Sequence, residues 1–355
     1  MPTGAKPTSL IARHRLRQIL GSLYKEGQEE IFFAGGDNGY WSNLSEHDNT
    51  QLMNAVKEMS CSDAIHASHP RLKDVIFSPK RAAGLELLEL DGSEVCADFG
   101  CMWGAIAVPL AKRCDYVVGF DQTLDSLRFA KKRAAEEGVD NIDFVCGDLK
   151  SSVFPETFFD IAVVNGVLEW IPETGHIDLT RYYGKFQKKR VSSRARDEQV
   201  AFLKAIRGSL KNAGKLYLAI ENRYDYKMFF GVPDPHPGIP FTSILPRSLA
   251  NVVSSVRLGR PYVNYTYSFN GLRDLALEAG FSSIDLYMCW PDYRFPDKIV
   301  PYASGLRNFR SLISSRNSQG KFRVRRAIAK IVETIVFRAA RAKFFAPSII
   351  AVAYK

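Results

Sequence analysis

Short, nearly continuous hydrophobic runs alternate with helical patterns from about residue 94 onward. Runs of this kind are typical of parallel strands that are buried on both faces of a sheet. The predicted strands span residues 95–99, 116–120, 142–146, 161–165, 216–220, 283–289 and 348–354. The helical patterns among them cover residues 103–113, 124–137, 197–210 and 271–279. The alternation predicts an α/β fold with a seven-stranded, mostly parallel sheet and helices on both faces.

Two regions depart from this alternation. Residues 1–80 carry mostly helical patterns, interrupted by a loop rich in Gly, Asp, Asn and Ser at residues 35–45. We therefore expect a helical N-terminal region over residues 1–80 and one α/β domain over residues 81–355. Long segments without strand patterns predict insertions into this domain at residues 171–196, 223–268 and 291–346. The last insertion is basic and helical and precedes the final strand.

The composition is that of an ordinary globular protein. Hydrophobic residues make up 46% of the chain and charged residues 24%, which excludes a disordered, collagen-like or disulfide-scaffold protein. No hydrophobic run approaches the roughly 18 residues that a membrane-spanning helix requires. Six scattered cysteines without a C-x-x-C pair, and no signal peptide ahead of them, favour a cytoplasmic protein with reduced thiols. The acid-free, basic first 25 residues fit an organelle transit peptide or an amphipathic helix over residues 10–24.

The positive charge is concentrated in two segments. The chain has 48 Lys and Arg against 38 Asp and Glu, and residues 307–343 hold eleven of these bases and one acid. A second acid-free basic run covers residues 181–196. A helix over residues 321–343 would have one apolar face and one basic face. Such a helix can contact an anionic membrane surface peripherally, or pack its apolar face on the domain, and the sequence leaves both open.

The first predicted strand leads directly into a glycine-containing turn, from Ala97 to Gly104, and then into a helix. A turn at a helix N-terminus presents backbone N–H groups to a ligand, and glycines allow the ligand to approach the backbone. A dinucleotide-binding turn needs G-x-G-x-x-G, but Met102 and Ala105 occupy the second and third glycine places. The turn therefore argues against a nicotinamide or flavin dinucleotide.

Three carboxylates follow the first three predicted strands. Asp98 ends the first strand, Asp121 ends the second, and Asp148 lies just after the third. In an open α/β sheet these strand ends line the crevice where ligands bind. An acid at the second strand commonly binds ribose hydroxyls, and a carboxylate at the third can accept a hydrogen bond from an adenine amino group. A ligand with a ribose, an adenine and a cationic amino-acid end satisfies all three.

Four segments together resemble the class I S-adenosylmethionine-dependent methyltransferases over roughly residues 81–290. They are residues 97–104, 118–121, 144–148 and 159–169. The resemblance implies a Rossmann-like fold and S-adenosylmethionine as cofactor. In this family the glycine turn holds the methionine moiety, the acid matching Asp121 binds the ribose, and the residue matching Asp148 contacts adenine. The cofactor-binding residues implied are Asp98, Gly100, Cys101, Gly104, Asp121, Gln122, Asp148, Leu149 and Asn165.

Later segments narrow the class of methyltransferase. Methyltransferases that act on amino groups of nucleic-acid bases typically carry an Asn/Asp-Pro-Pro-aromatic motif after the fourth strand, whereas this chain has Asn-Gly-Val-Leu at residues 165–168. A nucleic-acid partner is therefore disfavoured. Residues 219–223, 230–238, 279–281 and 290–296 resemble bacterial methyltransferases of surface-polysaccharide biosynthesis. That resemblance implies O-methylation of a sugar or glycan acceptor.

Methyl transfer to a hydroxyl needs a group that removes the hydroxyl proton. The predicted catalytic residues are His236, Glu221 and Glu169, which follow the fourth and fifth strands. His236 titrates near neutrality and lies in a proline-flanked loop, although it can instead simply hydrogen-bond that loop. The predicted acceptor-binding residues are Asn222, Arg223 and Arg294, with the arginines suited to an anionic acceptor such as a uronate or sugar phosphate. Glu221 and Arg223 can alternatively form a structural ion pair.

No metal site is expected from the sequence, because the other histidines show no metal-ligand spacing. Two alternative functions remain open. One is an RNA-directed methyltransferase that uses the basic segments as a phosphate clamp. The other is a catalytically silent subunit that binds the cofactor and supports a partner.

Overall fold

The computed structural model describes residues 14, 17–23, 25–26, 30–34, 44–150, 154–173, 194–304, 331, 335, 337 and 342–355. Residues 17–23 are helical, within the predicted amphipathic helix over residues 10–24. Most of the loop at residues 35–45, most of the basic run at residues 181–196 and most of the basic segment at residues 307–343 lie outside these described ranges. The predictions for those segments stay predictions.

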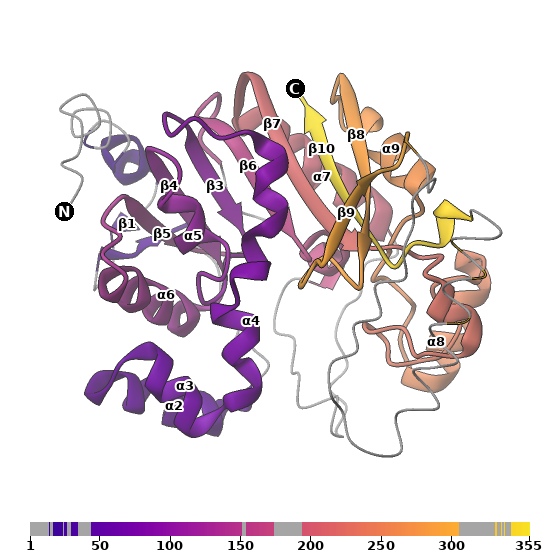
Figure 1. Ribbon diagram of the computed structural model, residues 1–355, viewed down its shortest axis with the longest axis horizontal. Coiled ribbons are helices and arrows are strands. Elements are labelled where there is room, and N and C mark those ends of the chain that lie inside the picture. The colour runs from indigo at the N-terminus through magenta and orange to yellow at the C-terminus, as the bar shows by residue number, and fades with distance from the viewer. Residues whose placement is uncertain are drawn as a thin grey trace.

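The centre of the molecule is a ten-stranded sheet in the order β1-β2-β5-β4-β3-β6-β7-β10-β8-β9 (Figure 1). The strands are β1 (Lys25–Glu26), β2 (Phe32–Phe33), β3 (Val95–Phe99), β4 (Tyr116–Asp121), β5 (Ile142–Cys146), β6 (Phe159–Asn165), β7 (Leu210–Glu221), β8 (Ser283–Trp290), β9 (Lys298–Pro301) and β10 (Ser348–Tyr354). All seven predicted strands are present. The prediction of seven was nevertheless wrong, because β1, β2 and β9 are too short to produce a readable hydrophobic period.

The sheet is mixed, with a parallel centre and antiparallel edges. Strands β2, β5, β4, β3, β6 and β7 pair in parallel. Strand β10 runs antiparallel between β7 and β8, and β9 pairs antiparallel with β8 at the edge. The parallel pairing places the carboxyl ends of β3, β4, β6 and β7 at one end of the sheet, where ligands bind in open α/β sheets.

Helices connect and cover the strands. The α-helices are α2 (Glu46–Glu58), α3 (Cys61–Ser68), α4 (Lys73–Phe77), α5 (Ala107–Ala111), α6 (Leu124–Glu136), α7 (Ala195–Ser209), α8 (Arg247–Leu258) and α9 (Phe269–Glu278). The 3₁₀ helices are η2 (Pro70–Leu72), η3 (Pro79–Leu88), η4 (Leu168–Glu173), η6 (Tyr226–Phe230) and η8 (Lys343–Phe345). The helix predicted over residues 103–113 is shorter than expected, because positive φ angles at Met102 (42°) and Gly104 (73°) keep the preceding residues in turns.

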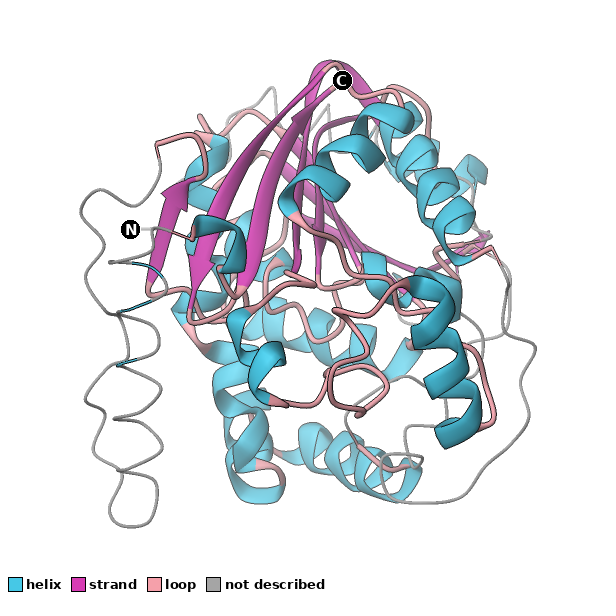
Figure 2. Cartoon of the chain, turned by 90° about the vertical axis from the view of Figure 1, so that its right-hand side faces the viewer, coloured by secondary structure: helices cyan, strands magenta, loops and turns pink. Residues whose placement is uncertain are grey.

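The central strands are buried on both faces because their alternate residues enter two different hydrophobic cores. In β3, Ala97 and Phe99 belong to a core with residues of α7 and α9, whereas Cys96 belongs to a core with residues of α5 and α6. Figure 2 shows the twisted sheet with helices packed against it. The continuous hydrophobic run of this strand thus reflects burial on both faces, as the sequence predicted.

The N-terminal region packs on the same body. A third hydrophobic cluster joins α2, α3 and α4 to Trp103 of the glycine turn and Phe129 of α6. Phe32 of β2 pairs in parallel with Val145 of β5, so this region also extends the sheet. Among the described residues, no helix is both long enough and apolar enough to cross a membrane.

Candidate active site at the carboxyl ends of the central strands

A cavity of about 1070 Å³ lies at the carboxyl ends of β3, β4, β6 and β7. The helices of the N-terminal region, the loop that contains His236 and the segment after β8 contribute the rest of its lining. In Figure 1 these elements lie below the sheet, with α2 to α4 on one side and α8 on the other. Eleven sequence-predicted site residues line the cavity: Asp98, Gly100, Cys101, Asp121, Gln122, Leu149, Asn165, Glu169, Glu221, His236 and Arg294.

The glycine turn between β3 and α5 forms one wall of the cavity. Gly100 has a φ angle of 80°, and a Cβ atom at this position would overlap the side chain of Val167. The Gly100 N–H donates to the Phe120 carbonyl at 2.7 Å, and the Met102 N–H donates to Asp121 Oδ2 at 2.9 Å. The turn is therefore fixed by the neighbouring strand β4, and Gly100 is needed for its shape.

Asp98 and Asp121 are the buried acids of this wall, with 2% and 5% of their surfaces exposed. Burial raises the pKa of Asp121 to about 6, although backbone N–H groups of Thr123 and Met102 oppose the rise. Burial also raises the pKa of Asp98 to about 7, opposed by the nearby charge of Arg81. Hydroxyl donors or a cation would stabilise the ionised form of both carboxylates.

Buried polar atoms at the same wall lack partners. Both side-chain amide atoms of Asn165, and Nε and Nη1 of Arg81, have no hydrogen-bond partner among the described residues. Polar atoms that are buried in this way normally pair with a ligand or water, and a guanidinium pairs best with a carboxylate. Sequence reasoning missed Arg81, which lies on η3 before the first core strand and outside any motif. Arg81 and Asp98 together offer a cation and an anion to the two charged groups of an amino acid.

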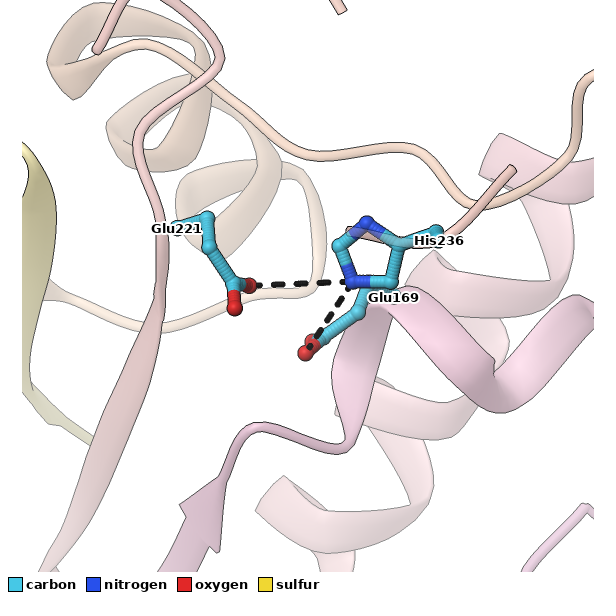
Figure 3. Close-up of side chains that lie close together, drawn as sticks. All are labelled: Glu169, Glu221 and His236. Carbon is cyan, nitrogen blue, oxygen red and sulfur yellow. Dashed lines mark ion pairs between the residues drawn. The ribbon is translucent and has the colours of Figure 1, made fainter. Parts of the chain in front are cut away.

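Glu169, Glu221 and His236 form a compact cluster at the other end of the cavity (Figure 3). Glu169 lies on η4 just after β6, and Glu221 is the last residue of β7. Nε2 of His236 lies 3.7 Å from Glu169 Oε1 and 3.7 Å from Glu221 Oε2. Parallel pairing of β6 and β7 thus brings the two acids together, and a loop supplies the histidine.

Asp234, which sequence reasoning did not single out, holds the imidazole of His236 in place. Asp234 Oδ1 lies 2.9 Å from Nδ1 of His236, and Asp234 Oδ2 accepts a hydrogen bond from the Tyr262 hydroxyl at 2.9 Å. Burial opposes protonation of the imidazole, but the bond to Asp234 and the nearby carboxylates raise the pKa of His236 well above its usual range. His236 therefore both bonds its own loop and presents Nε2 to the cavity, so the two sequence interpretations are compatible.

The two glutamates differ in their surroundings. Burial and the charge of Glu169 raise the pKa of Glu221 to about 7, opposed by His236. The Tyr293 hydroxyl donates to Glu221 Oε1 at 3.3 Å. Glu169 is fully buried, and neither of its carboxylate oxygens accepts a hydrogen bond from any described residue. The cluster therefore concentrates acceptor oxygens that face the cavity without donors.

Four predicted site residues do not line the cavity: Gly104 and Asp148, which were predicted to bind the cofactor, and Asn222 and Arg223, which were predicted to bind the acceptor. Gly104 packs against Val108 and Ala130, and Asp148 accepts a hydrogen bond from the Lys150 N–H, although the adjacent Leu149 does reach the cavity. Their predicted contacts with the cofactor stay predictions.

Asn222 and Arg223 have structural roles in place of the predicted acceptor contacts. The Asn222 side-chain amide donates to the carbonyls of Phe344 and Ala346, both at 2.7 Å. The Arg223 guanidinium donates to the carbonyls of Ser243 and Leu245 at 3.0 and 2.8 Å, so these carbonyls, and not Glu221, hold it. The assignment of both residues to acceptor binding is therefore not supported, because their donors are already used to fix two loops.

Comparison with known proteins identifies the central part of the chain. Residues 96–183 match the family model described as a methyltransferase domain. A 23S rRNA (uracil(1939)-C(5))-methyltransferase of Vesicomyosocius okutanii is 30% identical over 107 residues, which are 30% of this chain and 24% of the relative. An uncharacterized RNA methyltransferase of Clostridium tetani is 35% identical over 72 residues, covering 20% of this chain and 15% of the relative. This chain thus spans about a quarter or less of the length of these relatives.

Among solved structures, phosphoethanolamine N-methyltransferase 2 of Haemonchus contortus, in complex with S-adenosyl-L-methionine, matches 89% of this chain and 61% of its own. That match has 15% sequence identity and a TM-score of 0.44. A SAM-dependent methyltransferase of Thermotoga maritima matches 82% of this chain and 96% of its own, at 14% identity and a TM-score of 0.42.

Buried polar atoms of the cavity that lack partners among the described residues fit S-adenosylmethionine, the cofactor that the resemblance to class I methyltransferases implies. Asp121 would accept from ribose hydroxyls, while Arg81 and Asp98 would pair with the carboxylate and amino groups of the methionine end. Asn165, whose amide is both donor and acceptor, would satisfy its buried atoms on the same ligand.

Proposed function

We propose that this chain, which contains a methyltransferase domain over residues 96–183, is an S-adenosylmethionine-dependent methyltransferase that methylates a hydroxyl group of a sugar or glycan. One observation carries the proposal. The same cavity that the cofactor would occupy at Asp121 and Asn165 continues to the cluster of Glu169, Glu221 and His236. A methyl donor and an acidic, hydroxyl-binding cluster can therefore share one cavity.

The cofactor supplies a methyl group that is already activated on its sulfonium sulfur. The protein must position the acceptor oxygen opposite the departing sulfur and remove the hydroxyl proton. The cluster of Glu169, Glu221 and His236 would take up the proton that the acceptor hydroxyl loses when its oxygen gains the methyl group. The fixed glycine turn and the walls of the cavity would position the reactants, whereas the cluster would remove the proton.

A polyhydroxylated acceptor suits the cluster better than an anionic one with several phosphates. Both carboxylate oxygens of Glu169, and Oε2 of Glu221, lack hydrogen-bond donors among the described residues, and sugar hydroxyls are donors of the required kind. Arg294 lines the same end of the cavity and would pair with a single anionic group such as a uronate carboxylate. Three of the segments that resemble polysaccharide methyltransferases supply Glu221, His236 and Arg294, which supports a glycan acceptor.

The local similarity to RNA methyltransferases favours RNA as a second candidate acceptor. The matched relatives share only a limited stretch with this chain, and buried carboxylates beside the reacting position would repel phosphates. The basic segments that would contact RNA, or alternatively an anionic membrane through residues 321–343, lie mostly outside the described residues. We propose in addition that the protein is cytoplasmic and that residues 321–343 contact a membrane surface peripherally.

The proposal is tested by incubating the protein with methyl-labelled cofactor and a cell-envelope extract, then fractionating the products. We expect label in a saccharide fraction, with transfer reduced at least about tenfold in Glu221→Gln, because one general base contributes roughly 10²–10⁴-fold to rate. The matched control is Glu278→Gln, since Glu278 is exposed and pairs with Arg196 far from the cavity lining. Label in RNA would support the second candidate, and no transfer to either fraction would favour a silent partner subunit.

A further inference from the structure

We propose that Glu169, Glu221 and His236 form a binding site for a divalent metal ion at the acceptor end of the cavity. The metal site is inferred from the geometry of these three side chains alone and does not depend on the proposed methyl transfer. What the ion would do there rests on the proposed function, because a bound ion would contact the acceptor hydroxyl.

The distances within the cluster suit a metal ion better than direct hydrogen bonds. Nε2 of His236 lies 3.7 Å from a carboxylate oxygen of each glutamate, beyond the roughly 2.7–3.2 Å range of N–H···O bonds. One ligand atom from each of the three residues lies within 4.8 Å of the other two. Around an ion with bonds of about 2.0–2.2 Å, neighbouring ligand atoms lie roughly 3–3.6 Å apart. A small inward movement of these side chains would therefore complete the coordination.

The burial of the carboxylates provides independent support for a cation. Glu169 is fully buried, points into the cluster in Figure 3, and has no hydrogen-bond donor on either oxygen among the described residues. Oε2 of Glu221, the atom nearest His236, also lacks a donor. Buried carboxylates are costly unless they are paired or bind a metal ion. The imidazole of His236 contacts three carboxylates, those of Glu169, Glu221 and Asp234. The acidic groups of the cluster therefore outnumber its basic group, and a divalent ion would neutralise the excess.

Asp234 orients the histidine as metal-binding histidines are usually oriented. It accepts from Nδ1 of His236 at 2.9 Å, which leaves Nε2 directed at the two glutamates. Metal-binding histidines almost always donate their second ring N–H to a carboxylate or carbonyl. Tyr262 and Thr242 donate to the other oxygen of Asp234 and keep it in position.

The ligand set indicates the kind of ion. One imidazole nitrogen and two carboxylate oxygens, without a thiolate, suit Mn²⁺, Fe²⁺ or Zn²⁺ better than a soft ion such as Cu⁺. Three protein ligands leave further positions open toward the cavity. In those positions the ion would hold the acceptor hydroxyl and make its proton easier to remove. The sequence predicted no metal site because the three ligands come from three separate segments.

Titration with Mn²⁺ alone tests the inference, using the electron paramagnetic resonance signal of the free ion and the purified full chain. We expect the wild type to bind one Mn²⁺ per chain. Asp234→Asn is expected to weaken binding about 10–100-fold, as loss of an outer-shell partner commonly does, and Glu169→Gln at least as much. Glu278→Gln, which alters an exposed carboxylate of the same type, is expected to bind like the wild type.

Calorimetry with S-adenosylhomocysteine on the same samples separates the two proposals and shows that each variant is folded. A wild type that binds S-adenosylhomocysteine but leaves the Mn²⁺ signal free would overturn the metal site and leave the methyltransferase proposal intact. Equal Mn²⁺ affinity in the wild type, Glu169→Gln and Asp234→Asn would also overturn it. If Glu169→Gln does not fold, Asp234→Asn and His236→Gln decide the outcome.

Discussion

At the scale of single residues, the buried charges on the β3 and β4 wall explain how the cavity distinguishes its ligand. Asp98 and Asp121 lie at adjacent strand ends, and Arg81 approaches Asp98 from η3. Burial makes each of these charges costly, and a ligand with complementary groups would offset that cost. A ligand with hydroxyls, an ammonium and a carboxylate is therefore recognised by charge as well as by shape.

The raised pKa of Asp98 predicts how the stability of the unliganded protein depends on pH. Its pKa of about 7 in the folded protein exceeds the ordinary aspartate pKa of 3.8, so folding favours the protonated form. Its contribution to stability is full below about pH 4 and is lost as the pH rises through 7. Asp98→Asn removes this dependence. The unfolding free energy of the variant, relative to the wild type, should rise between pH 4 and 8 by an amount on the order of a few kcal/mol at most.

Denaturant unfolding of both proteins without cofactor, at pH 4, 6 and 8, measures this difference. Parallel pH profiles for the two proteins would show that Asp98 has an ordinary pKa and that the wall is less enclosed than its burial indicates.

At the scale of elements, the turn between β3 and α5 is the part of the fold that the proposed function ties most closely to the cofactor. Three residues of this turn have positive φ angles, and its N–H groups bond to β4 at Phe120 and Asp121. Met102, which occupies the second glycine place of the dinucleotide-binding pattern, adopts a φ angle of 42° and packs its side chain toward the cluster formed by α2 and α3. The turn thus keeps its shape despite the replaced glycine.

Gly100→Ala tests the turn, and Gly138→Ala is its matched control. Both glycines have positive φ angles, 80° and 68°, but only a Cβ atom at Gly100 would overlap a neighbour, Val167. We expect Gly138→Ala to lower stability by about 1 kcal/mol without changing affinity for S-adenosylhomocysteine. We expect Gly100→Ala to lower stability by about 1–3 kcal/mol and affinity at least about tenfold.

Thermal unfolding and calorimetry of the two variants provide the measurements. An unchanged affinity in Gly100→Ala would mean that the turn does not contact the cofactor.

The elements also show what sequence patterns can predict. Six of the seven longer strands and helix α6 were predicted to within about two residues, because burial on two faces or along one helix face leaves a clear pattern, whereas β7 begins at Leu210, well before the predicted residues 216–220. The short strands β1, β2 and β9 leave no such period, and the N-terminal part of the predicted helix at residues 103–113 forms turns because local backbone geometry overrides helical propensity. Pattern thus predicts the core of the sheet but not its edges or its tight turns.

At the scale of the whole molecule, the cavity is built from segments that are far apart in the sequence. Residues of α2 and η2 face the glycine turn, the ends of β6 and β7, and the loop of His236. Motif spacing and the family resemblance predicted Asp98, Gly100, Asp121 and Asn165, which lie at or just after the carboxyl ends of the neighbouring strands β3, β4 and β6. Arg81 and Asp234 were missed because their roles depend on tertiary contacts with Asp98 and His236, which no local pattern reveals.

The net charge of the whole chain does not indicate the charge of the cavity. The net charge of +10 arises from residues 307–343, which lie mostly outside the described part of the chain. The cavity itself is lined at its acceptor end by Glu169, Glu221 and His236. We therefore propose that the basic segment serves docking to a partner or a membrane, and that the chemistry belongs to a locally acidic site.

Calorimetric titration with S-adenosylhomocysteine tests the central claim, that the cavity at Asp121 binds the methyl donor. We expect the wild type to bind one equivalent, and Asp121→Asn to bind about 10–100-fold more weakly, because a hydrogen bond to a charged group contributes roughly 1.5–3 kcal/mol. Asp143→Asn is the matched control, since Asp143 lies on the next strand, bonds to Tyr116 and does not line the cavity; it should bind like the wild type. Absence of binding to the wild type, or equal affinity in Asp121→Asn, would contradict the account.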